Sequence, residues 1–351
     1  MDSLSQAALG AAIGEAAAGR SAGRKAAAWG AALATLPDLD VFTPLADDVL
    51  EFTSHRSITH SLPVMAVAAP VLVWALGRLH PQVRNDRRRW SALVLACLWT
   101  HALLDAFTAY GTQLLWPLPL TPVAWSTIFI VDPAYTLPLL AGLIIALAHR
   151  GRRAHRCNTA GLCLSTAYLL WTAGAQNHVE ELGHRTAAAA GVEVDRIMAT
   201  PTPFNSLLWR ILVMTPDGDY LEGYHSLADG DDRPPALRRH DGRRRLLEPL
   251  SHTWAVRRLQ WFTDGYYAAR LDGRRVVLAD LRMGLEPFYV FQFVVGEIAG
   301  GGQPAPVAAV QAAMPGTSRS QLAWVWRRIR DPDAVWADRG LTHTEIEGSK
   351  E

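Results

Sequence analysis

Side chains able to bind a metal ion are few in the first half of this chain, and they fall into three short clusters. The clusters are Asp38 with Asp40, His55 with His60, and His101 with Asp105. Each cluster adjoins or interrupts a long apolar stretch, where an ionisable group is costly unless it pairs, binds an ion or lines a cavity. Imidazole and carboxylate groups together suit Zn²⁺, and they also accept Mn²⁺ or Fe²⁺. These residue types therefore predict a metal site, provided that the three clusters meet.

The spacing of His101 and Asp105 gives the first indication of where they could meet. The two residues are four apart, so on a helix they share one face. Counted from Trp90 at a rise of about 1.5 Å per residue, His101 lies about 16 Å along that helix and Asp105 about 22 Å. Both therefore lie at or beyond the middle of a hydrocarbon layer about 30 Å thick.

Four apolar stretches are long enough to cross a bilayer, which takes about 20 helical residues. They cover residues 61–79, 91–109, 127–148 and 158–177. Two Ala-rich stretches, 4–19 and 26–43, are less apolar and are predicted to span, to re-enter or to pack inside the bundle. The chain is therefore predicted to begin with a membrane α-helical bundle of four to six transmembrane helices.

Basic residues are distributed unevenly among the links between these stretches. Twelve fall in three links, namely Arg20, Arg24 and Lys25; Arg78, Arg84, Arg87, Arg88 and Arg89; and Arg150, Arg152, Arg153 and Arg156. The alternate links, 38–60 and 110–126, hold Arg56 alone. Because cytoplasmic loops collect Lys and Arg, the three basic links are predicted to face the cytoplasm of a multi-pass protein of the bacterial inner (plasma) membrane. The alternate links, which hold or adjoin the three clusters, then face outwards, and the clusters are expected to converge there.

The chain divides into a membrane domain, residues 1–178, and a polar domain, residues 179–351, predicted to be a soluble, extracytoplasmic α+β domain. Runs of β-forming residues separated by turn sequences predict an antiparallel sheet. The predicted elements are strands at Leu207–Thr215, Tyr220–Leu227, Tyr266–Leu271, Arg274–Leu281 and Phe288–Val295 and a helix at His252–Phe262. Residues 300–304 are predicted to form a loop or linker, and the last dozen residues a disordered tail.

Charge and motifs argue against several classes of function. The net charge is +1, so no basic field favours a nucleic-acid partner, and membrane lipid is the expected partner instead. The three cysteines, Cys97, Cys157 and Cys163, all lie outside the polar half, so no disulfide framework is expected. The sequence has no Gly-x-Ser-x-Gly elbow, no phosphate-binding loop and no dinucleotide fingerprint beside a strand.

Several blocks of the sequence occur together in one order. They are Met1–Gly10, Leu36–Asp40, His55–Ser61 and His101–Asp105, followed by Tyr110–Pro117 and Val131–Pro138. In these blocks the chain resembles the membrane-bound metal-dependent hydrolase family, whose YdjM-like members are described as LexA-regulated inner-membrane proteins. The resemblance covers residues 1–150 best, and the tail, including Pro201–Asn205, is similar to that of the longer members. The chain departs from the family at Gln6, where many members carry His, and at Ser57, where Gly commonly follows the arginine.

The resemblance implies a metal-dependent hydrolase with a role in the stress response. The favoured ligands are His55, His60, His101 and Asp105. Asp38 or Asp40 would complete the metal shell or act as the general base. A metal there would polarise the scissile group and acidify a bound water. If a histidine at position 6 is a ligand in other members, Gln6 leaves this site one group poorer.

The substrate follows from the depth of the site. A site at headgroup depth predicts a lipid or a lipid-linked ester or phosphoester. Arg56 and Thr59 are expected to orient an anionic substrate, and pairing of Arg56 with Asp38 or Asp47 is an equal alternative.

A second hypothesis is a non-enzymatic membrane protein in which the His/Asp cluster holds helices together and the outer domain binds a partner. A third is a metal transporter, which the sequence disfavours because its polar residues gather on one side without a path to the cytoplasmic face. The set of groups itself, mixed N and O donors with a coordination position left open, is typical of a catalytic site.

Overall fold

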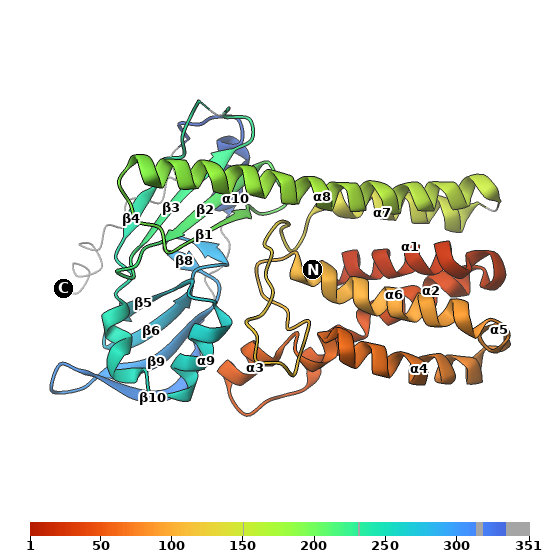
Figure 1. The fold of residues 1–351 in the computed structure, drawn as a ribbon, viewed down its shortest axis with the longest axis horizontal. Coiled ribbons are helices and arrows are strands. Elements are labelled where there is room, and N and C mark those ends of the chain that lie inside the picture. Colours follow the sequence, from red (N-terminus) through yellow and green to blue (C-terminus); the bar gives the residue numbers. More distant parts are fainter. Residues whose placement is uncertain (150, 231, 314–318, 335–351) are drawn as a thin grey trace.

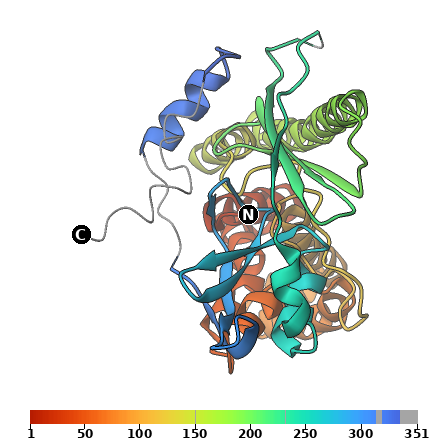
Figure 2. The same cartoon turned by 90° about the vertical axis from the view of Figure 1, so that its left-hand side faces the viewer.

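The computed structural model describes residues 1–149, 151–230, 232–313 and 319–334. The molecule is elongated, with the helices of the first half at one end and the β-sheets of the second half at the other (Figure 1). One long helix, α8 (Arg152–Ala189), runs from the helical half to the sheets. A view along the long axis shows the sheets in front of the helices (Figure 2). The prediction of a helical first half followed by an antiparallel sheet domain is confirmed.

Each apolar stretch of the first half contains a helix. The long helices are α1 (Ser3–Ala22), α2 (Arg24–Thr35), α4 (Leu62–Leu79), α6 (Arg87–Ala106), α7 (Pro133–Ala148) and α8, and the short ones are η1 (Pro37–Phe42), α3 (Asp48–Ser54), η2 (Ile58–His60) and α5 (Pro81–Asn85). The predicted stretch 26–43 is divided, because α2 ends at Thr35 and Pro37 opens the 3₁₀ helix η1. Proline has no backbone N–H to continue the α-helical pattern, so the chain turns there.

Among the described residues, α4 alone is both long and apolar enough to cross a membrane by itself. Helix α7 is apolar but has 16 residues. Helix α6 opens with three arginines, and α1 and α2 are rich in Ala rather than Leu. Helices α1 and α2 also approach closely, since a Cβ built on Gly10 would lie 2.2 Å from the carbonyl oxygen of Gly30. The predicted bundle of four to six spans thus has one clear candidate span in this structure.

The second half contains two four-stranded antiparallel sheets and a two-stranded one. The first sheet has the order β1 (Arg196–Pro201), β2 (Leu208–Met214), β3 (Tyr220–Ser226) and β4 (Arg238–His240). The second has the order β10 (Pro304–Gln311), β9 (Gln292–Ile298), β6 (Arg275–Asp280) and β5 (Tyr267–Asp272). Strands β7 (Gly284–Leu285) and β8 (Phe288–Tyr289) form the small sheet, and the helices are η3 (Arg244–Leu250), α9 (Trp254–Phe262) and α10 (Arg319–Arg328).

The predicted elements of this domain correspond to β2, β3, β5, β6 and α9. The single strand predicted at Phe288–Val295 is instead divided into β8 and β9, because the chain passes from the small sheet to the larger one. Strands β1 and β10 and helix α10 were not predicted. The tail predicted to be disordered lies outside the described residues.

One hydrophobic cluster contains side chains from both halves of the chain and lies next to the candidate residues. The ring of Phe52 in α3 lies 4.7 Å from that of Phe262 and 5.1 Å from that of Phe293, centroid to centroid. Tyr110, which follows α6, lies 5.3 Å from Phe52, and its hydroxyl donates to the Phe52 carbonyl at 2.7 Å. Because α3 directly precedes His55, the sheet domain helps to hold that part of the chain in place.

Candidate metal centre

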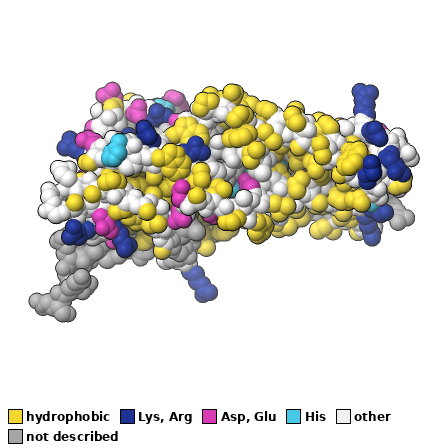
Figure 3. All heavy atoms as spheres, turned by 90° about the horizontal axis from the view of Figure 1, so that it is seen from below, with side chains coloured by type: hydrophobic (Ala, Val, Ile, Leu, Met, Phe, Trp, Pro, Cys, Tyr) yellow, Lys and Arg dark blue, Asp and Glu magenta, His cyan; other side chains and the backbone are white. Residues whose placement is uncertain are grey.

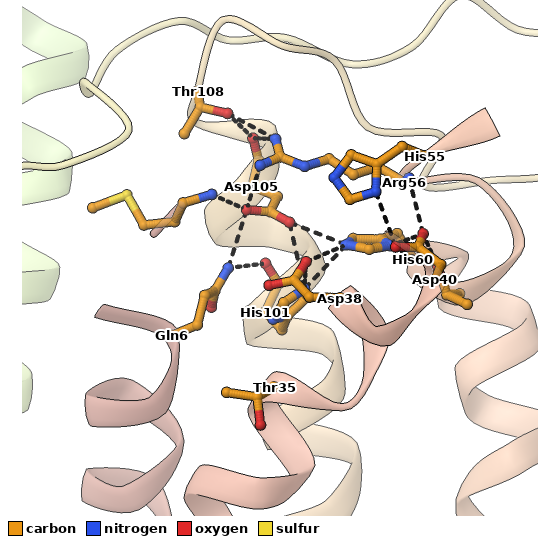
Figure 4. A network of polar contacts seen from close by, with 12 residues as sticks. Gln6, Thr35, Asp38, Asp40, His55, Arg56, His60, His101, Asp105 and Thr108 are labelled. Atoms are coloured by element: carbon orange, nitrogen blue, oxygen red, sulfur yellow. Dashed lines mark hydrogen bonds and ion pairs between the residues drawn. The ribbon is translucent and has the colours of Figure 1, made fainter. Parts of the chain in front are cut away.

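Four side chains from three parts of the chain meet at the end of the bundle that adjoins the sheet domain (Figure 4). His101 and Asp105 lie one turn apart on α6, as their spacing predicts. His60 ends η2, immediately before α4, and Asp38 lies in η1, which follows α2. We call these four residues the metal cluster. They form a group that could hold a metal ion, with one donor atom from each within 4.8 Å of every other.

The donor atoms of the metal cluster are spaced as ligands of one small cation would be. The Nε2 atoms of His60 and His101 are 3.0 Å apart, and each is 3.4 Å from Asp38 Oδ1. Asp105 Oδ2 is 3.1 Å from His60 Nε2 and 3.4 Å from His101 Nε2. With bonds of about 2.1 Å to nitrogen or oxygen, the edges of a coordination tetrahedron are about 3.4 Å long. The five distances therefore fit a tetrahedral site within a few tenths of an ångström.

The hydrogen bonds around the metal cluster leave His60 Nε2 and Asp105 Oδ2 free to bind a metal ion. Thr59 Oγ1 donates to Asp40 Oδ2 at 2.8 Å, so it accepts from His60 Nδ1, which lies 2.9 Å away. In a neutral imidazole the hydrogen is then on Nδ1, and Nε2 presents its lone pair to the cluster. Asp105 Oδ2 is fully buried and has no hydrogen-bond partner. Buried polar atoms are rarely left without a hydrogen-bond partner, so a carboxylate oxygen that faces two ring nitrogens in this way fits a bound cation.

The metal cluster is closed on most sides. His60, His101 and Asp105 are completely buried, whereas the Asp38 side chain is 26% exposed. Asp38 is thus the one member of the metal cluster whose side chain is partly exposed.

Two predicted ligands, Asp40 and His55, lie outside the metal cluster and pair with each other. Asp40 Oδ1 bonds His55 Nδ1 at 2.9 Å, and Asp40 Oδ2 accepts from Thr59 and, at 3.3 Å, from the backbone N–H of Arg56. Asp40 is 3.8 Å from His60, on the Nδ1 side of that ring. In this arrangement Asp40 and Thr59 orient His60. Asp38, rather than the predicted Asp40, supplies the carboxylate among the donor atoms. A carboxylate that orients a ligating imidazole in this way is a common feature of metal sites.

Arg56 is buried against Asp105. Its Nη2 lies 3.2 Å from Asp105 Oδ1, and its Nη1 donates to Thr108 Oγ1 at 3.0 Å. The guanidinium also lies over the Tyr110 ring, 5.0 Å from its centroid. The sequence left open whether Arg56 clamps a substrate or pairs with Asp38 or Asp47, and the structure pairs it with Asp105 instead. The residue has a φ of 60°, in the left-handed region, and it is buried.

Gln6, which the sequence analysis considered only as the loss of a possible ligand, contributes a hydrogen-bond donor to the site. Its Nε2 donates to Asp105 Oδ1 at 3.1 Å and to the His101 carbonyl at 3.2 Å, and the residue is completely buried. The Met1 amino group also pairs with Asp105 Oδ1. Together with Arg56, these donors occupy Oδ1 and leave Oδ2 to the metal cluster. The signal that could have found Gln6 is a polar amide on the apolar face of an Ala-rich helix.

Comparison with known proteins identifies a family for the first half of the chain. Residues 1–179 match the protein family described as "YdjM inner membrane protein". The chain is 27% identical over 203 residues to "Uncharacterized protein YfhP" of Bacillus subtilis (strain 168), a match that covers 57% of this chain and 60% of that protein. The matched part therefore spans about three fifths of the length of that relative. No solved structure matches the chain significantly.

Proposed function

Because the chain belongs to the YdjM inner membrane protein family, we propose that it is a membrane-bound metal-dependent hydrolase acting at the outer face of that membrane. The observation that carries the proposal is the division of the metal cluster into three buried donors and one partly exposed donor. Catalytic sites commonly hold the metal with three protein ligands and keep a fourth position for water or substrate. His60, His101 and Asp105 supply the fixed set, and Asp38 occupies the position next to solvent.

Each residue then has a defined task. His60, His101 and Asp105 would hold the ion, and Asp38 would complete its shell or accept a proton once displaced from it. A divalent ion held there supplies Lewis acidity to a scissile group and lowers the pKa of a coordinated water towards neutrality. Arg56 and Gln6 keep Asp105 oriented, and Asp40 and Thr59 keep His60 oriented. The donor set of two imidazoles and two carboxylates favours Zn²⁺, with Mn²⁺ or Fe²⁺ as alternatives.

The proposal includes a multi-pass topology. Lys and Arg gather at the end formed by α5 and the α1–α2 turn, and apolar side chains cover the surface between that end and the sheet domain (Figure 3). If α1, α2, α4, α6, α7 and α8 all cross the bilayer, the positive-inside rule places this basic end in the cytoplasm. The metal cluster and the sheet domain are then extracytoplasmic, and the substrate is a membrane lipid or a lipid-linked ester or phosphoester.

Metal analysis of detergent-purified protein tests the first step. We expect wild type to retain close to one equivalent of a divalent metal and His101→Ala to retain almost none. His155→Ala is the matched control, because His155 pairs with Glu15 in another part of the bundle, at 3.1 Å. Loss of metal in the control as well, or no metal in wild type after addition of Zn²⁺, Mn²⁺ and Fe²⁺ in turn, would rule out the site.

A panel of lipid and soluble esters and phosphoesters tests the second step. Hydrolysis by wild type and none by His101→Ala, at equal expression, would support catalysis. Hydrolysis of soluble substrates alone would remove the lipid from the proposal.

One observation favours a second candidate, a non-enzymatic protein whose metal holds the helices together. Four protein donors at tetrahedral spacing are also the arrangement of a closed structural site. For that candidate His101→Ala would unfold the bundle, and metal-loaded wild type would hydrolyse nothing in the panel.

A further inference from the structure

The segment that follows α6 is unusual for a loop at a protein surface. Residues 106–131 contain no Asp, Glu, Lys, Arg or His. Three of its leucines, Leu115, Leu118 and Leu120, are exposed, and the side chain of Leu118 is 57% exposed. Exposed apolar groups that cluster without any charge among them commonly mark a surface that contacts another apolar phase.

Hydrogen bonds attach this segment to the start of α4, the candidate span. The backbone N–H of Leu62 donates to the Leu114 carbonyl at 2.9 Å, and the Ser61 hydroxyl donates to the Trp116 carbonyl at 2.8 Å. The outward face of α4 is apolar as well, with Val67 78% exposed. The exposed leucines therefore continue the apolar surface of a helix that is itself suited to lipid.

The length of the helices indicates that lipid reaches this level. Helix α4 has 18 residues and α7 has 16, which correspond to about 27 Å and about 24 Å at the α-helical rise. The hydrocarbon of a bilayer is about 30 Å thick, so both helices are a few ångströms short. The opposite end of α4 carries Arg78 in its last turn, and Arg84 and Arg87 follow. Those charges hold that end at the headgroups, so the missing apolar length falls at the cluster end.

The segment that supplies Asp38 shows the same character. In η1 the side chain of Asp38 belongs to the metal cluster, whereas its neighbours Leu39 and Val41 are exposed. Phe42, at the end of η1, is 78% exposed. The loop after α6 also contacts a neighbour of the cluster, because the backbone N–H of Gln113 donates at 2.9 Å to the carbonyl of Arg56, which pairs with Asp105. Apolar side chains thus flank the cluster on two segments that are far apart in sequence. We call this set the apolar rim: Leu39, Val41, Phe42, Leu115, Leu118 and Leu120.

We propose that the apolar rim is seated in the outer leaflet, at the boundary between acyl chains and headgroups, and that molecules reach Asp38 from the lipid phase. Resting on the proposed function, this makes the substrate an amphiphile that moves laterally into the site with its chains along the rim. A lipid surface also accounts for the absence of charge from residues 106–131, because a charged side chain at that depth would be costly.

Spin labelling of the protein in phosphatidylcholine–phosphatidylglycerol vesicles tests the seating. Leu118→Cys and Phe42→Cys carry the label, in a background with Cys157 and Cys163 changed to Ser and Cys97 left buried. The matched control is Val307→Cys, an exposed apolar position on β10 of the sheet domain. We expect oxygen to be more accessible than a water-soluble nickel chelate at positions 42 and 118, and the reverse at 307. If 42 and 118 behave like 307, the rim faces water and the proposal is overturned.

Two esters of the same headgroup test lateral access. One is a long-chain ester embedded in the vesicles, and the other is a short-chain, water-soluble ester. We expect Leu118→Lys to reduce hydrolysis of the embedded ester about tenfold relative to the soluble one, because a charged side chain on the rim disfavours contact with acyl chains; Val307→Lys should change neither rate. Equal loss with both esters would overturn lateral access. If wild type hydrolyses neither, the proposed function fails and lateral access with it, while the accessibility result still decides the position of the rim.

Discussion

Two buried groups of polar side chains can be compared in this molecule, the metal cluster and a network inside the sheet domain. In the sheet domain, Arg210 donates from Nε to Glu222 Oε2 at 2.8 Å and from Nη1 to the Leu281 carbonyl at 2.7 Å. Glu222 also accepts from the hydroxyls of Tyr224 and Tyr289 at 2.8 Å and 3.1 Å. Both groups are buried and both contain charge, but they differ in whether their atoms are satisfied.

The network of the sheet domain is complete, and the metal cluster is not. Every side-chain nitrogen and oxygen of Arg210 and Glu222 has a partner, whereas Asp105 Oδ2, which lies among the donor atoms of the metal cluster, has no hydrogen-bond partner. A complete network is sufficient for a structural role. An incomplete one, with ligand-type atoms facing one point, costs stability unless something else occupies that point. The comparison therefore favours a structural role for the first group, whereas the second is a group that could hold a metal ion.

Removing a member of the complete network should have the largest effect on folding. Glu222→Ala leaves the Arg210 guanidinium buried without its counter-charge, which costs about 3–5 kcal/mol. We expect a large fall in the midpoint of thermal unfolding of the full chain in detergent. Replacing both partners, Arg210→Met with Glu222→Leu, should restore most of the loss, because well-packed apolar residues substitute for buried ion pairs at little cost. If Glu222→Ala were as stable as wild type, the Arg210–Glu222 network would have no structural role, and its contrast with the metal cluster would be wrong.

Altering the partner of a ligand should instead affect the metal. Arg56→Leu removes the ion pair to Asp105 Oδ1 and should weaken Zn²⁺ binding about 10- to 100-fold, the usual effect of losing a residue that orients a ligand. Competition with a chelating dye measures the affinity, and Arg56→Lys should recover part of it.

Arg282→Leu is the matched control for that variant, since Arg282 forms a comparable buried pair with Asp280 at 2.7 Å in the sheet domain. It should lower stability and leave the affinity for Zn²⁺ unchanged. Equal affinities for wild type and Arg56→Leu would show that Arg56 has no influence on the cluster.

The sequence was most informative where the relevant spacing is local. His101 and Asp105 could be assigned to one helix face from their separation of four residues, and the positive-inside rule then brought His60 and Asp38 to the same end. The choice between Asp38 and Asp40 could not be made, because it depends on which way a single 3₁₀ turn faces after Pro37. The insertion of Phe52 into the core of the sheet domain is a contact between distant parts of the chain, which local patterns do not contain.

There are also physical reasons why strands β1 and β10 could not be predicted from the sequence. Strand β10 contains Pro304 and Pro306, and the Gly-rich residues before it have the composition of a linker. Proline is tolerated in edge strands, and β10 lies at the edge of its sheet. Strand β1 is likewise an edge strand and ends at Pro201. In both cases pairing with a stronger neighbouring strand, rather than the propensity of the segment itself, decides the structure.

The complete network should also show its charge in the pH dependence of stability. Burial raises the pKa of Glu222, but Arg210 and its hydrogen bonds outweigh burial, and the pKa is lowered overall. Because the pKa of Glu222 is lower in the folded state than in the unfolded state, the ionised carboxylate stabilises the folded protein above the unfolded pKa of about 4.3. That contribution to stability is lost as the pH falls through the lower pKa of the folded state. The difference in unfolding midpoint between wild type and Glu222→Gln should therefore be constant above about pH 5 and shrink below about pH 4. A difference that grows on acidification would contradict the assignment.

The smallest effect is expected at Gln6, where the incomplete group can be altered without changing any charge. Gln6→Leu keeps the side-chain volume and removes the donor to Asp105 Oδ1, while Arg56 still holds that oxygen. Zn²⁺ affinity should fall about tenfold or less, towards the lower end of the effects seen for residues that orient a ligand. Gln176→Leu is the control, because Gln176 donates to the carbonyls of Trp125 and Ala199 at 2.7 Å and 2.8 Å, away from the cluster. If both variants bind Zn²⁺ as wild type does, Gln6 fills space beside the cluster and does not orient Asp105, and the boundary of the metal centre is then drawn at Arg56.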